Sequence, residues 1–159
     1  MWYTPGMKIY LDADGIPCRK DVLECARRYG ILVVVVADYS HDIALERGME
    51  RITVDTGTDA ADIAIVNRIQ QGDLVVTQDV GLAALALHKG AAVISPRGYK
   101  FTERSVQEGL TVRWLRRKVR AAGGRMRGPR RFSGDDRTRF LVLLQRTINT
   151  LIGRSDENR

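Results

Sequence analysis

Five aspartates stand where carboxylates could work together. Asp12 directly follows an apolar run and Asp14 comes two residues later, while Asp79 lies two residues beyond a second apolar run. Asp59 and Asp62 are three residues apart, a spacing that puts them on one face of a helix. Clustered carboxylates repel one another unless a cation neutralises them, and Mg²⁺ or Mn²⁺ prefers such oxygen ligands. One or two such ions could activate water and stabilise a phosphodiester during hydrolysis.

Each aspartate also has a structural interpretation. Asp59 can be a helix N-cap, with Asp62 completing a first-turn pair. Asp14 precedes Gly15, which is typical of a turn. Asp12 is harder to explain structurally, because it closes an apolar strand where an aliphatic residue is expected.

The hydrophobic pattern predicts the elements that position these side chains. We expect strands at residues 7–11, 31–37, 51–54, 74–77 and 91–94, and helices at 17–29, 59–71 and 80–89. Their alternation indicates an α/β fold, a single doubly wound parallel sheet of about five strands. With strand order 3-2-1-4-5, Asp12, Asp14 and Asp79 converge at the switch point, where such sheets bind ligands, and Asp62 lies at the rim.

Charge divides the chain. Residues 1–96 hold 9 Lys and Arg against 13 Asp and Glu, whereas residues 97–139 hold 14 against 4. We interpret residues 7–96 as an acidic α/β body and residues 97–152 as a basic helical part of the same domain. Residues 1–6 are extra, because the first strand begins at Met7, and residues 153–159 form a tail.

The basic part is expected to bind nucleic acid. Helices are predicted at residues 113–122 and 133–152, the second opened by a capping box of Ser133 and Asp136. Helical spacing puts four arginines on one stripe, and two further cations precede them: Arg113, Arg116, Arg117 and Arg120, with Arg97 and Lys100. Arginine pairs well with phosphate, so binding would be electrostatic and salt-sensitive.

Apolar side chains of these segments carry further expectations. Trp114 and Leu115 should dock the basic helix on the body, and Ile63, Val66 and Ile69 should face inward from the helix at 59–71. Tyr99 and Phe101 could stack on unpaired bases, although core packing is the stronger expectation. Cys18 and Cys25 are expected to pack within a helix, since two cysteines do not make a zinc site.

Four motifs together resemble the YaiI/YqxD-type bacterial proteins, a family grouped with PIN-like nucleases. They are residues 9–14 (IYLDAD), 57–62 (GTDAAD), 72–79 (GDLVVTQD) and 95–98 (SPRG), and the resemblance covers roughly residues 7–152. It implies a metal-dependent nuclease acting on RNA, with Asp12, Asp62 and Asp79 catalytic and Thr77 supporting them. A further acidic position, which many PIN domains place on a middle helix, has no clear match, and either Asp14 or Asp59 could substitute for it.

Two other functions stay open. The first is a nucleic-acid-binding module that has lost catalysis, because the acidic set is incomplete. The second is a haloacid-dehalogenase-like phosphatase, whose DxD motif resembles Asp12-Ala13-Asp14. Against it, Pro17 starts a helix where that fold usually inserts a flap.

No apolar run approaches the ~20 residues of a membrane helix. Residues 1–6 lack the features of a secretory signal, so we expect a cytoplasmic location and no membrane partner.

Overall fold

The computed structural model confirms a parallel α/β sheet and describes residues 6–12, 17–40, 43–57, 59–128 and 130–157. Its five strands are β1 (Lys8–Asp12), β2 (Leu32–Asp38), β3 (Met49–Val54), β4 (Leu74–Val76) and β5 (Ala92–Ile94). Their order is β3-β2-β1-β4-β5 and every pair is parallel, as predicted. The sheet therefore reverses its strand order between β1 and β4.

The central strand shows why these segments form a sheet covered on both faces. Leu11 of β1 lies in register with Val35 of β2 and Val76 of β4, and all three are fully buried. Neighbouring residues point to opposite faces, so Leu11 and Tyr10 belong to different apolar clusters. Continuous apolar strands of this kind require helices on both sides.

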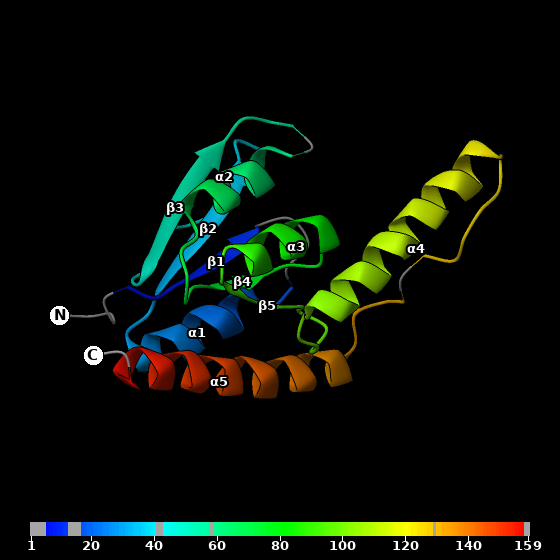
Figure 1. Cartoon of the computed structure of the whole chain (residues 1–159). Helices are drawn as coiled ribbons and strands as arrows, with labels where there is room; N and C mark the ends of the chain where they lie inside the picture. Colours follow the sequence, from blue (N-terminus) through cyan, green and yellow to red (C-terminus); the bar gives the residue numbers. More distant parts are fainter. Residues whose placement is uncertain (1–5, 13–16, 41–42, 58, 129, 158–159) are drawn as a thin grey trace.

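Helices provide those two layers (Figure 1). On one face, α1 (Arg19–Tyr29) and α5 (Gly134–Glu157) pack against the cluster that contains Leu11. On the other face lie α2 (Ala60–Arg68), α3 (Val80–His88) and the beginning of α4 (Glu103–Ala121). Cys18 and Cys25 are buried and free in the first layer, in agreement with a packing role. No helix among the described residues is long and apolar enough to span a membrane.

The inward face of α2 differs from the prediction. Ile65 and Ile69 are buried, but Ile63 is 58% exposed and Val66 only partly buried. The helix ends at Arg68 and turns its small Ala64 toward the sheet, which rotates Ile63 away from the core. Ile63 therefore lines a surface hollow.

The basic helix is longer than predicted and docks through other residues. Helix α4 begins after Thr102, which forms a capping box with Ser105. The buried residue of this helix is Val106, in its first turns. Trp114 is 55% exposed and Leu115 is also exposed, so the prediction that they dock the helix is wrong. The far half of α4 projects away from the body (Figure 1).

Gly109 explains how closely α4 approaches α3. A Cβ atom added at Gly109 would lie 2.7 Å from Cγ2 of Val80, the first residue of α3. Glycine at this position thus lets the two helices cross in contact. Because α3 begins beside Asp79, the crossing brings the basic helix next to an acidic strand end.

A buried carboxylate fixes the beginning of α5. Asp136 is fully buried, and its backbone N–H and carboxylate exchange hydrogen bonds with Ser133, as the predicted capping box requires. Arg97, Arg130 and Arg139 donate to the same carboxylate, with Arg130 Nη1 2.8 Å from Oδ2. The hydrogen bonds from Arg130 hold the pKa of Asp136 well below its usual range. Helix α5 then continues to Glu157, beyond the predicted end at residue 152.

Replacing Asp136 by asparagine should lower the thermal midpoint by about 5 °C or more, because three guanidinium groups lose their counter-charge. A carboxylate whose folded pKa is depressed stabilises the protein above the unfolded pKa, and this contribution disappears as pH falls. The stability difference between the wild type and the variant should therefore begin to shrink below about pH 4. Thermal unfolding at pH 7 and pH 3 measures both effects. Asp135→Asn, an exposed change one residue away, should do neither.

Candidate functional site

The carboxyl ends of β1 and β4 bring the predicted aspartates to one place. Asp12 is the last residue of β1, and β1 and β4 are neighbours. Thr77 follows β4 and is buried, and Asp79 lies two residues farther, at the start of α3. Asp62 reaches the same region from the first turn of α2. The predicted switch point is thus populated by side chains from three separate elements.

Local hydrogen bonds fix Asp79. The Asp79 N–H donates to Oγ1 of Thr77 at 3.0 Å, which tightens the turn after β4. One oxygen, Oδ1, accepts from the N–H groups of Gly81 (2.7 Å) and Leu82 (3.2 Å), so Asp79 is the N-cap of α3. The same oxygen lies 3.9 Å from Nη1 of Arg113 on α4. Asp79 therefore has a structural role that the sequence analysis did not assign to it.

Asp62 has a strongly perturbed carboxyl. Its pKa is raised to about 7, first by burial and then by the negative charges of Asp79 and Asp12. A side-chain hydrogen bond with Asp79 and the charge of Asp59 act in the same direction. Burial and the neighbouring negative charges both disfavour the ionised carboxyl, and a cation would offset the effect of those charges.

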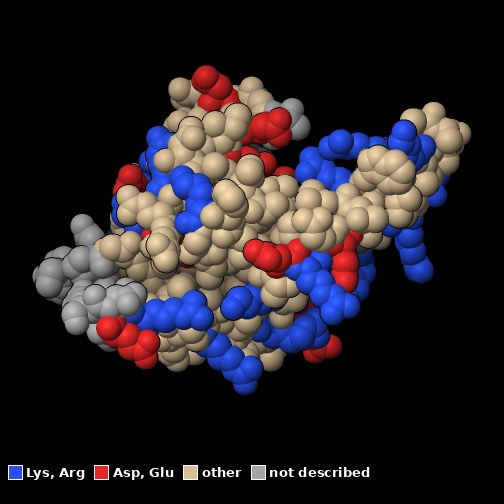
Figure 2. Space-filling model, viewed as in Figure 1, with Lys and Arg blue, Asp and Glu red and all other residues tan. Residues whose placement is uncertain are grey.

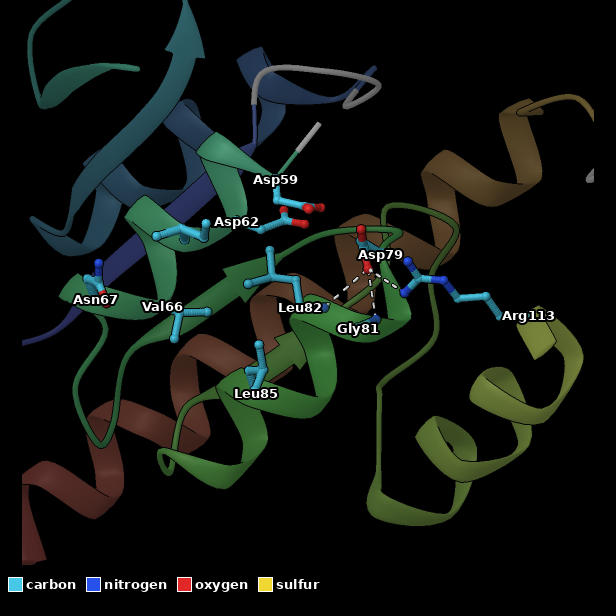
Figure 3. Close-up of a pocket in the computed structure, with 10 residues that line it drawn as sticks. Asp59, Asp62, Val66, Asn67, Asp79, Gly81, Leu82, Leu85 and Arg113 are labelled. Carbon is cyan, nitrogen blue, oxygen red and sulfur yellow. Dashed lines mark hydrogen bonds and ion pairs between the residues drawn. The ribbon is translucent and has the colours of Figure 1, made fainter. Parts of the chain in front are cut away.

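Three of these aspartates line a hollow of about 380 Å³ between α2 and α3 (Figure 3). Asp59, Asp62 and Asp79 lie at one end of it with Arg113, while aliphatic side chains form the remainder. Asp59 occupies the N-cap position of α2, but its side chain accepts no capping hydrogen bond from the described part of that helix. Asp14 lies outside the described residues.

A second hollow, of about 620 Å³, continues from the first along α4. Arg113, Arg116, Arg117 and Arg120 all line it, as their helical spacing predicted. Asp79 and Arg113 line both hollows. In Figure 2 the Lys and Arg atoms of α4 face a group of acidic atoms across the gap between the helix and the body. An acidic hollow and a basic groove thus lie next to each other, with Asp79 and Arg113 in the walls of both.

The structure places the other two predicted cations elsewhere. The Arg97 side chain is only 17% exposed and bonds to Asp136, to the Arg130 carbonyl and to Oε1 of Gln78. Lys100 is exposed, but it lines a different hollow beside α5. Tyr99 is exposed and lines the basic groove, whereas Phe101 is buried and contacts Tyr99 edge to face.

Sequence reasoning missed several residues of the site. Gly81 is one, because a Cβ there would lie 2.8 Å from Nη1 of Arg113 and 3.1 Å from Oδ1 of Asp79. Glycine at this position leaves room for the contact between them. The aliphatic wall was also missed: Ile63, Val66, Leu82 and Leu85. Ile63 and Leu85 are more than half exposed, which a hydrophobic pattern cannot indicate because it predicts burial only.

The possible metal ligands at this site are carboxylate oxygens, which hard divalent cations prefer. The negative charges of these carboxylates repel one another, and a bound cation would offset that repulsion. No group of three or more potential ligands that could hold an ion is present among the described residues. Mg²⁺, however, is commonly bound by one or two carboxylates together with water and substrate phosphates. Asp62 and Asp79 share a hydrogen bond, so they are the two carboxylates that would hold such an ion.

Comparison with known proteins places the chain in a family. The family model described as "Uncharacterized BCR, YaiI/YqxD family" matches residues 10–150. A UPF0178 protein of Bacillus anthracis (strain A0248) and one of Bacillus cereus (strain AH820) are each 42% identical over 144 residues, which cover 89% of this chain and 99% of theirs. A UPF0178 protein of Bacillus mycoides (strain KBAB4) is 41% identical over the same lengths. No solved structure matches the chain. The chain therefore belongs to the YaiI/YqxD family of bacterial proteins.

Proposed function

We propose that the protein is a metal-dependent nuclease of the PIN-like kind, which hydrolyses phosphodiester bonds in RNA. One observation supports this above the others: the acidic hollow and the arginine-lined groove share Asp79 and Arg113. A polyanion that follows the groove reaches the carboxylates directly. A protein that bound only a cation would not need the arginine-lined groove. A protein that bound only a nucleic acid would not need the acidic hollow.

The chain's own residues divide the work. Arg116, Arg117 and Arg120 hold backbone phosphates along α4, and Arg113 orients the phosphate that reaches the carboxylates. Asp62 and Asp79, with the nearby charge of Asp12, would hold Mg²⁺ or Mn²⁺, an ion that supplies Lewis-acid polarisation and an activated water. Thr77 keeps Asp79 in place through the turn after β4.

The first test is cleavage of an end-labelled single-stranded RNA with Mn²⁺ or Mg²⁺, compared with EDTA. Cleavage should require the ion, and Asp12→Asn should reduce it by about 10-fold to 100-fold, the range expected when a supporting charge near a metal is lost. p-Nitrophenyl phosphate in the same plate tests the phosphatase alternative, which predicts hydrolysis of that substrate instead. If neither substrate is turned over with any ion, the nuclease proposal fails.

A binding module without catalysis is the second candidate. Two observations favour it: the described residues contain no three-ligand group, and Asp79 already serves as a helix cap. Under this alternative, RNA binds in a salt-sensitive manner with or without the ion, and Asp12→Asn has no effect on anything but stability. Binding measured by fluorescence anisotropy in Mn²⁺ and in EDTA separates the two functions.

A further inference from the structure

The acidic hollow has an unusual second half. Beyond the carboxylates its walls are aliphatic: Ile63 and Val66 from α2, and Leu82 and Leu85 from α3. Ile63 is 58% and Leu85 53% exposed, and both line this hollow. Two helices of the body thus leave large aliphatic side chains in water beside a charged site, where burying them with a ligand would be favourable.

Polar groups mark the two ends of the same hollow. Arg113 and the carboxylates lie at one end, and Asn67 lies at the other, beyond Val66 (Figure 3). The Asn67 amide is exposed and offers two donors and one acceptor. A matching ligand has a group that Arg113 or a carboxylate-bound cation would hold, an apolar body and a polar edge, in that order.

A nucleotide has this sequence of features, and the arginine-lined groove would bring it here in a chain. We propose that the aliphatic half of the hollow binds the nucleobase next to the phosphate that lies at Asp62, Asp79 and Arg113. The inference rests on the proposed function, because the nucleotide is taken to be part of the RNA that the protein cleaves. A base can enter only when it is unpaired and unstacked, so the substrate is single-stranded where it meets the carboxylates.

The walls suggest modest base preference. Aliphatic side chains accept the face of any base, and Asn67 alone among the lining residues carries an amide that could read its edge. The pocket therefore determines strandedness more than sequence. This differs from readout in the basic groove, where the arginines contact phosphates and do not distinguish bases.

The test uses the full chain with labelled methyl groups on Ile, Leu and Val. Nucleotides are added, and NMR records the shifts of the methyl signals. In the presence of Mg²⁺, uridine and adenosine 5′-monophosphates should shift the methyl signals of Ile63, Val66 and Leu85. Ribose 5-phosphate, which lacks the base, should leave those methyl signals in place. Leu85→Ser should weaken nucleotide binding about fivefold through lost apolar contact. Val142→Ser, the same kind of change at an exposed site on α5, should leave binding unchanged.

Three results would overturn the inference: methyl signals that no nucleotide moves, equal shifts with ribose 5-phosphate, or shifts with octanoate instead of nucleotides. The last result would mark the hollow as a site for a small aliphatic acid. Because binding is read without cleavage, failure here is distinct from failure of the nuclease. A protein that cleaves RNA while its pocket methyl groups stay unmoved refutes only the base pocket.

Discussion

Replacing Asp62 by asparagine should lower metal-dependent RNA cleavage by about 100-fold or more while making the protein more stable at pH 8. Both effects have one cause. At pH 8 the Asp62 carboxylate is ionised beside Asp79 and Asp12, and their repulsion opposes folding. Asparagine keeps the shape of the side chain but removes that charge, so the variant loses an ion ligand and gains a few degrees in thermal midpoint.

The dependence on pH follows from the raised pKa of Asp62, about 7 against an ordinary value of 3.8. Between these values the folded protein holds a proton that the unfolded chain has released. The free energy of unfolding from this group therefore falls as pH rises from about 4 to about 7. The advantage of Asp62→Asn should grow over the same range. Cleavage by the wild type should rise up to about pH 7 and then level off, because the ion competes with the proton.

Thermal unfolding with and without Mn²⁺ supplies the independent measurement. The ion should raise the midpoint of the wild type at pH 8 but not that of the variant, since binding to the folded state is linked to stability. Asp55→Asn is the matched control: it is an exposed aspartate after the edge strand β3, which β2 and β1 separate from β4. Equal cleavage by Asp62→Asn and wild type would remove Asp62 from the site.

The sheet and its switch point were predictable because parallel strands that are buried on both faces appear in the sequence as continuous apolar runs. The run at residues 31–37 marks β2, and an aspartate directly after the run at 7–11 marks the end of β1. Strand order then places Asp12 and Asp79 together without any side-chain information. This part of the site depends on sheet topology. The types and lengths of the predicted strands and helices are enough to indicate that topology.

The other half of the site depends on rotation and docking of helices, which the pattern did not determine. The segment before Arg113 contains Gly109 and β-branched residues that disfavour helix, yet Thr102 caps it and Val106 anchors it. Ile63 faces out because Ala64 and Ile65 take the inner positions. Arg97 resembles a phosphate ligand in sequence, but its buried partner Asp136 stands 39 residues away. Such contacts between distant segments have no local signal.

Replacing Arg116, Arg117 and Arg120 together by glutamine should weaken binding of a 12-nucleotide single-stranded RNA about 100-fold in 0.1 M salt. Each arginine that neutralises a phosphate releases a counterion, so the slope of log affinity against log salt should fall by about two. Arg113 is left in place because it contacts Asp79, and its loss would disturb the acidic site as well. Fluorescence anisotropy from 0.05 to 0.5 M KCl measures both quantities.

A control variant with the same loss of charge tests whether RNA binds along the groove of α4 or is attracted only by the total positive charge of the protein. Lys100, Arg146 and Arg154 line the hollow beside α5, so replacing these three by glutamine removes equal charge elsewhere. If affinity depended only on total charge, the two triple variants would lose it equally. A specific path along α4 requires the first variant to lose far more, and to lose cleavage because RNA no longer reaches Asp79. Equal losses would separate the basic helix from the carboxylates and leave the shared position of Arg113 without a function.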